Sequence, residues 1–98
     1  MTIQELKAAL ADAFPHVWIE DGEQFDTPLA GALWTGEGSS VNIAGDETEY
    51  IPVDAFDMSP MFPSMYTSGV YNSLHIYLAD RGFRAEAYDP GTFFIWKN

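Results

Sequence analysis

Residues 83–96 read FRAEAYDPGTFFIW, and this stretch predicts how the chain ends. The runs Phe83–Tyr88 and Thr92–Trp96 are rich in aromatic side chains, which favour β-strands. Between the two runs, residues 89–91 read DPG, a combination of residue types that suits a tight turn. The stretch therefore predicts an antiparallel hairpin.

Two helices are predicted upstream from apolar residues at helical spacing. The first spans residues 3–13, because Thr2–Glu5 has the capping-box pattern that begins a helix. The second begins at residue 64 or 67 and runs to residue 81, where Gly82 suits a helix C-cap.

The chain between the helices predicts strands and one irregular segment. A hairpin is expected from residues 29–35 and 41–44, joined by a turn at residues 36–40. Three further segments complete this region: a strand at 16–19, a strand at 49–53 with Pro52 at a sheet edge, and an irregular segment at 54–63 packed on the core.

This order of elements favours an α+β fold. We expect an antiparallel sheet of about five to six strands, with both α-helices packed on one face. A length of 98 residues suits one core, so residues 1–98 are expected to form a single domain.

Composition excludes several classes of protein. There is no cysteine, which rules out disulfides, thiolate catalysis and cysteine-based metal sites. No apolar run approaches the ~18 residues of a membrane span, and the first residues, MTIQELK, are polar. We therefore expect a soluble cytoplasmic protein that does not bind a membrane.

The charge is strongly negative and unevenly distributed. Fifteen acidic and four basic residues give −11 at pH 7, and no lysine or arginine occurs in residues 8–80. A field of this sign repels nucleic acid and attracts basic proteins. Carboxylates on a rigid scaffold can occupy a groove that normally accepts phosphates, so a nucleic-acid mimic without direct nucleic-acid binding is predicted.

The predicted partner-binding site consists of the acids in the expected turns and two neighbouring aromatic anchors. These residues are Asp21, Glu23, Asp26, Asp46, Glu47, Glu49, Tyr50, Asp54, Phe56 and Asp57. The expected partner is a basic nucleic-acid-binding protein or complex, and the chain itself is expected to be a monomer or a homodimer.

In its size, its lack of cysteine and its acid-dense stretch from Glu20 to Asp57, the chain resembles small phage-encoded anti-CRISPR proteins. Several of those proteins block the basic nucleic-acid surfaces of CRISPR effectors. They share no fold or diagnostic motif, so the resemblance assigns no residue a role. It implies an inhibitor in the bacterial host cell that binds an immune complex such as a type I Cascade.

Two other functions compete with this interpretation. Residues 56–66 hold six methionine, phenylalanine or tyrosine side chains, typical of a docking or dimerisation surface in a phage or bacterial assembly protein. Alternatively, His16 or His75 could join Glu20 or Asp80 in a metal-assisted enzyme. Neither histidine has local metal-ligand spacing and no nucleophile motif occurs, so we expect no catalytic residue, metal or other cofactor.

Overall fold

The computed structural model describes residues 1–25, 30–44 and 50–98. It contains two α-helices, two short 3-10 helices and eight strands among these residues. In chain order they are α1 (Ile3–Ala13), β1 (Glu20–Asp21), η1 (Gly22–Gln24), β2 (Leu33–Gly36), β3 (Ser40–Ala44), β4 (Tyr50–Asp54), η2 (Pro63–Met65), β5 (Tyr66–Thr67), β6 (Val70–Tyr71), α2 (Asn72–Asp80), β7 (Phe83–Asp89) and β8 (Thr92–Lys97).

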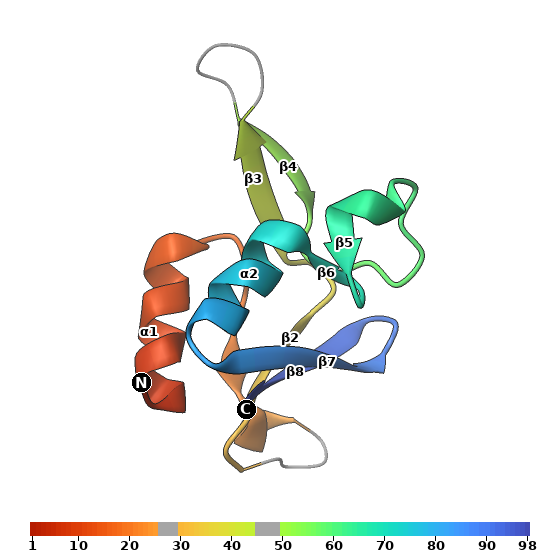
Figure 1. The fold of residues 1–98 in the computed structure, drawn as a ribbon. Coiled ribbons are helices and arrows are strands. Elements are labelled where there is room, and N and C mark those ends of the chain that lie inside the picture. Colours follow the sequence, from red (N-terminus) through yellow and green to blue (C-terminus); the bar gives the residue numbers. More distant parts are fainter. Residues whose placement is uncertain (26–29, 45–49) are drawn as a thin grey trace.

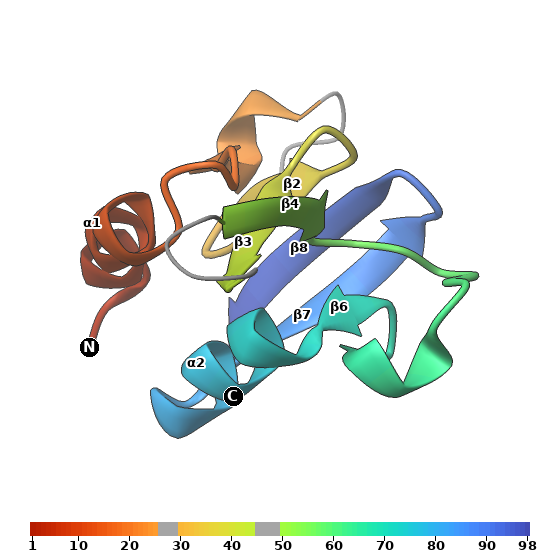
Figure 2. The ribbon, with the colours of Figure 1, turned by 90° about the horizontal axis from the view of Figure 1, so that it is seen from above.

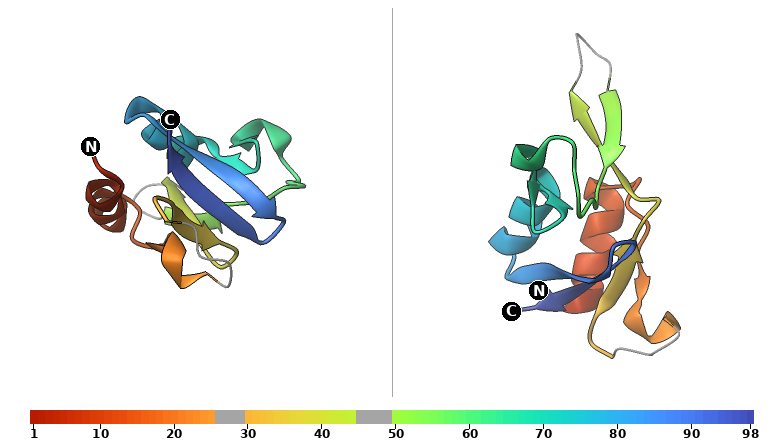
Figure 3. Two further views of the ribbon diagram at one scale, coloured as in Figure 1. Left: turned by 90° about the horizontal axis from the view of Figure 1, so that it is seen from below. Right: turned by 90° about the vertical axis from the view of Figure 1, so that its right-hand side faces the viewer.

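The α+β class is confirmed, but the strands form three sheets instead of one sheet of five to six strands. The main sheet is antiparallel with the order β1-β2-β8-β7, and Figure 2 shows β2, β8 and β7 side by side. The pairs β3-β4 and β5-β6 form separate two-stranded sheets. We call the β3-β4 pair the arm, because it projects from the rest of the molecule (Figure 1; Figure 3).

Both helices pack on one face of the main sheet, as predicted. Leu33 lies opposite Ile95 across β2 and β8, so their side chains share a face. The buried leucines of α1, Leu6 and Leu10, belong to the same core cluster as these two residues. Leu74 and Leu78 of α2 join that cluster too.

Aromatic side chains cover the opposite face of the sheet. Phe25, which follows η1, makes edge-to-face contacts with Trp34, Phe94 and Tyr88, with ring centroids 5.3, 5.0 and 5.3 Å apart. Trp34 also contacts Trp18 at 5.2 Å. Such geometry is the preferred one for aromatic pairs.

Predictions based on local signals are confirmed. Helix α1 has the predicted bounds, and its capping box forms: the backbone N–H of Glu5 donates to Thr2 Oγ1 at 3.1 Å, and that of Thr2 donates to Glu5 Oε1 at 2.8 Å. The terminal hairpin appears as β7 and β8. Gly82 follows α2 with a φ of 84°, as a helix C-terminus favours.

The second helix begins later than predicted. Residues before Asn72 form η2 and the β5-β6 pair instead. The turn of that pair is made by Ser68 and Gly69, with φ values of 50° and 82°. Two consecutive positive φ values suit a tight hairpin turn and interrupt a helix.

The predicted strand at 16–19 is wrong, because its polar groups bond outside any strand ladder. The Trp18 N–H donates to Ser39 Oγ at 3.2 Å, and the Trp18 carbonyl accepts from Thr35 Oγ1 at 2.6 Å. The strand in this part of the chain is β1, which pairs with β2.

The predicted hairpin between residues 29–35 and 41–44 is also wrong. Both segments contain a strand, but β2 pairs with β8 and β3 pairs with β4. The chain turns away after β2 because the Glu37 N–H donates to the Gly91 carbonyl at 2.8 Å, which joins this turn to the β7-β8 turn.

The prediction of an irregular segment at 54–63 is confirmed for the residues that follow β4. The prediction that this segment packs on the core holds only for part of it. Phe56 is 8% exposed, whereas Met61 is 86% exposed.

Within the described residues, neither helix is long and apolar enough to cross a membrane.

The close approach of Gly36 to Gly91 generates a stability prediction. A Cβ at Gly36 would lie 2.2 Å from the Gly91 carbonyl oxygen. The clash in Gly36→Ala should therefore lower the free energy of unfolding by about 1–3 kcal/mol, in addition to the cost of the positive φ. Gly82→Ala is the matched control, because Gly82 also has a positive φ but a Cβ there meets no described atom within 4 Å. The control should lose about 1–2 kcal/mol, the cost of a left-handed backbone for a residue with a Cβ, and Gly36→Ala should lose more than the control because of the added clash. Urea unfolding measures both; equal losses would contradict the close approach.

Candidate functional site

The structure divides the predicted site residues between two regions. Asp21 and Glu23 lie in β1 and η1, whereas Asp54, Phe56 and Asp57 lie at and beyond the end of β4. Tyr50 begins β4. Asp26, Asp46, Glu47 and Glu49 lie outside the described residues.

Asp21 links α1 to the sheet. Its Oδ1 accepts from Gln4 Nε2 at 2.9 Å and from Lys7 Nζ at 3.3 Å. The hydrogen bond from Gln4, followed by that from Lys7, holds the pKa of Asp21 below its ordinary value. Asp21 therefore has a structural role and is partly compensated by a cation, which makes it a weaker candidate for contacting a basic partner.

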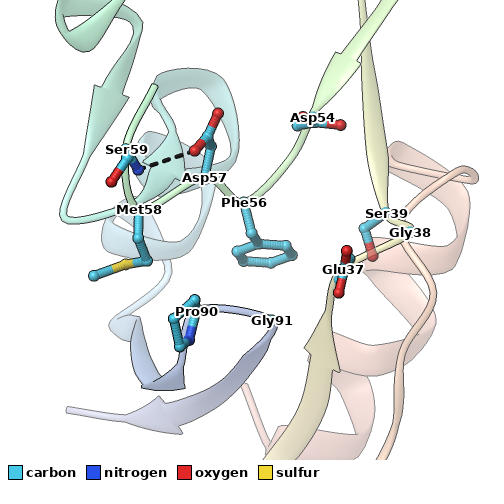
Figure 4. A pocket seen from close by; sticks show the side chains of 10 residues that line it. All are labelled: Glu37, Gly38, Ser39, Asp54, Phe56, Asp57, Met58, Ser59, Pro90 and Gly91. Atoms are coloured by element: carbon cyan, nitrogen blue, oxygen red, sulfur yellow. Dashed lines mark hydrogen bonds between the residues drawn. The ribbon is translucent and has the colours of Figure 1, made fainter. Parts of the chain in front are cut away.

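Three carboxylates surround a pocket at the base of the arm. The pocket has a volume of about 360 Å³, and Figure 4 shows Glu37, Asp54 and Asp57 at separate places around it. Phe56, Met58 and Gly91 are among the other lining residues. The three acids come from two chain segments, which are joined where the Ala55 N–H donates to the Ser39 carbonyl at 3.1 Å.

None of these three carboxylates forms an ion pair with a described residue. The ion pairs within residues 1–25, 30–44 and 50–98 are Lys7–Asp21 and Arg84–Glu86. Asp57 Oδ1 instead accepts from the Ser59 N–H at 3.0 Å. The pocket therefore carries a concentrated negative charge.

Tyr66 lies within that negative field. Its hydroxyl donates to the Asp54 carbonyl at 2.7 Å. Burial raises the pKa of Tyr66, and the charges of Asp54 and Asp57 raise it further. The hydroxyl therefore stays protonated and remains a donor at neutral pH.

Exposed apolar side chains lie next to the same carboxylates. Met58, Met61 and Phe62 are 48%, 86% and 62% exposed. A second pocket of about 290 Å³, lined in part by Met61 and Phe62, shares Asp54 and Asp57 with the first. We call the set of Glu37, Asp54, Asp57, Met58, Met61 and Phe62 the acidic-apolar surface.

The prediction that Phe56 is an aromatic anchor for a partner is wrong. Phe56 is buried, and its ring lies 4.5 Å from the ring of Phe93 in the core. It cannot serve as an exposed anchor; instead it fixes the backbone that presents Asp57 and Met58. Glu37, which the site prediction omitted, lies in a glycine-rich turn, and two contacts between distant residues place it at the pocket: its own with Gly91 and that of Ser39 with Ala55.

The two histidines do not form a metal centre with described residues. His16 lines a different groove, beside Phe14 and Asn42, and His75 lies on α2. Within the described part of the chain, no three histidine or acidic side chains are arranged to hold a metal ion.

Comparisons with protein-family models, curated proteins and solved structures give no match for this chain.

The role of Asp21 generates a pH prediction. Because its pKa is lower in the folded state, its contribution to stability is present above its unfolded pKa, about 4, and is lost as the pH falls through the folded value. Asp21→Asn should therefore lower Tm by a few degrees at pH 7 and have little effect near pH 2. Thermal unfolding followed by circular dichroism measures this.

Glu23→Gln is the control, since Glu23 is an exposed acid close to Asp21 in the chain. This variant should leave Tm at pH 7 unchanged or raise it by reducing self-repulsion. A loss for Asp21→Asn that is as large at pH 2 as at pH 7 would show that the charge of Asp21 is not what stabilises the fold.

Proposed function

We propose that this chain is a non-catalytic binding protein that occupies the basic nucleic-acid-binding surface of a partner protein or complex. The observation that supports it is the acidic-apolar surface, where Asp54 and Asp57 lie between two pockets and carry no ion pair with a described residue. CRISPR effectors such as a type I Cascade belong to this class of partner, and the resemblance to anti-CRISPR proteins favours them.

The energetics assign different tasks to the two parts of the surface. An exposed ion pair contributes about 0–1 kcal/mol, so the carboxylates chiefly accelerate encounter and select basic partners. Full burial of a methionine or phenylalanine side chain contributes about 1.5–3 kcal/mol. Most of the affinity would therefore come from Met58, Met61 and Phe62, and the charge would determine where they bind.

Competition with DNA tests the proposal. The protein should release a fluorescent DNA duplex from a basic partner in an anisotropy assay with a nucleoid protein, a restriction enzyme and a type I CRISPR effector. Asp54→Asn/Asp57→Asn should weaken this effect about tenfold, since each lost pair contributes up to about 1 kcal/mol. The rate of association of the unaltered protein should fall as salt rises.

Asp12→Asn/Asp80→Asn is the matched control, because it removes the same charge from exposed positions on α1 and α2. It should retain release within about twofold. Equal weakening by both pairs of substitutions would show that only net charge acts. If the protein releases DNA from none of the three partners, the proposed function is refuted.

A second candidate function is an assembly module that docks or dimerises through residues 56–66. The exposure of Met61 and Phe62 favours it, because large exposed apolar side chains mark protein contacts. In this case the interface would be dominated by apolar contacts and would persist at high salt.

Met61→Ser/Phe62→Ser separates the two candidates. Both side chains are largely exposed, so Tm should change little. Under the leading proposal the variant should lose at least tenfold in DNA release while light scattering reports the same mass for both proteins. A homodimer that persists from 0.05 to 0.5 M salt and dissociates in the variant would instead support assembly.

A further inference from the structure

The two edges of the arm differ in their capacity to accept another strand. In the β3-β4 ladder, the Ala55 N–H donates to the Ser39 carbonyl at 3.1 Å, which identifies this pair as hydrogen-bonded across the arm. Along two antiparallel strands, residue pairs that are hydrogen-bonded to each other alternate with pairs whose backbone groups point away from the partner strand. Val41 and Ile43 therefore direct their backbone groups toward β4, and Ser40 and Asn42 direct theirs outward.

The outer edge of β4 is closed. Pro52 lies opposite Asn42, at a position whose backbone faces outward, and it has no N–H to donate. The next outward carbonyl along the strand, that of Asp54, accepts from the Tyr66 hydroxyl. This edge therefore offers little to an added strand.

The outer edge of β3 is open. Its first outward amide, that of Ser40, donates to the His16 carbonyl at 3.0 Å, so the turn at residues 14–17 occupies this edge for one residue. The next outward amide belongs to the exposed Asn42 and has no backbone partner among the described residues. Residues 14–16 leave the edge at this point.

A groove runs beside this open edge. It has a volume of about 400 Å³, and Phe14, His16, Val41 and Asn42 are among the residues that line it. The end of α1 forms one wall, and Ser73 of α2 also contributes. An added strand would bond to Asn42 and turn alternate side chains into the groove, as in peptide recognition by strand addition.

We propose that the β3 edge binds an extended, basic segment of a partner polypeptide. The residues that line the groove include no lysine, arginine, aspartate or glutamate, so the preference for a cationic occupant comes from the net charge of −11 on the chain. A second copy of this chain also carries a net charge of −11, so repulsion between the two copies disfavours it as the occupant. The β3 edge and the acidic-apolar surface lie on different edges of the arm, so each can be tested without the other.

A substitution at Asn42 removes the outward donor without breaking the arm. Asn42→Pro reproduces on β3 what Pro52 already does on β4, because both positions face outward and neither contributes an N–H to the ladder. Asn42→Ala is the matched control, since it removes the side chain and keeps the backbone N–H.

The probe is an acetylated, amidated peptide that alternates lysine and valine over six residues, with its glutamate-valine counterpart as a charge control. Nuclear magnetic resonance titration should show the lysine peptide slowing hydrogen exchange of the Asn42 amide. Asn42→Pro should weaken binding at least tenfold, Asn42→Ala should change it less than twofold, and the glutamate peptide should bind at least tenfold more weakly.

Three results would overturn the proposal. One is binding of the lysine peptide that is equal in Asn42→Pro and the unaltered protein. Another is a titration in which the Asn42 amide is not protected. The third is a concentration-dependent homodimer that Asn42→Pro dissociates, which would make a second copy the occupant. If Asn42→Pro does not fold, the exchange of the Asn42 amide in the unaltered protein still decides the outcome.

Discussion

The approach of the Gly36-Glu37 turn to Gly91 is the constraint on which the arrangement of this molecule depends. Only hydrogen fits between the Gly36 Cα and the Gly91 carbonyl, and the Glu37 N–H closes the contact with a 2.8 Å hydrogen bond. Because β2 ends against the turn of the terminal hairpin, the chain must leave the main sheet there. The arm is the result, and Glu37 lines the same pocket as Asp54 and Asp57 (Figure 4).

Charge and apolar exposure are combined on the acidic-apolar surface. A soluble protein normally hides side chains such as Met61 and Phe62, and it normally intersperses carboxylates with lysines. Neither occurs here in the described residues around Asp54 and Asp57. The two features support each other in a binding role, because the field attracts basic surfaces and the apolar side chains retain them.

Features encoded by neighbouring residues were predictable from the sequence, and those that depend on distant contacts were not. The capping box of α1 and the DPG turn of the terminal hairpin act within a few residues, and both elements were predicted correctly. Strand pairing is different, since the composition of β2 and β3 indicates strands but not their partners. The Ser68-Gly69 turn was hidden within apolar spacing that also suits a helix.

The candidate site follows the same division. Asp54 and Asp57 were anticipated because an acid-rich sequence without lysine indicates an exposed negative surface. Glu37 was missed, because its place at the pocket depends on a contact with a residue more than 50 positions away. Phe56 was assigned to the surface because an irregular segment gives no periodicity from which burial can be read, and the ring in fact packs on Phe93.

The proline in β4 also limits how far this molecule could associate with itself. Stacking of arms into a fibril would require each arm to be joined on both sides, since every added copy must leave a site for the next. With Pro52 and the Tyr66 hydroxyl on one side, the arm has a single side left for pairing. Self-association through the arm would thus stop at a pair, which protects a protein with an exposed two-stranded projection from runaway polymerisation.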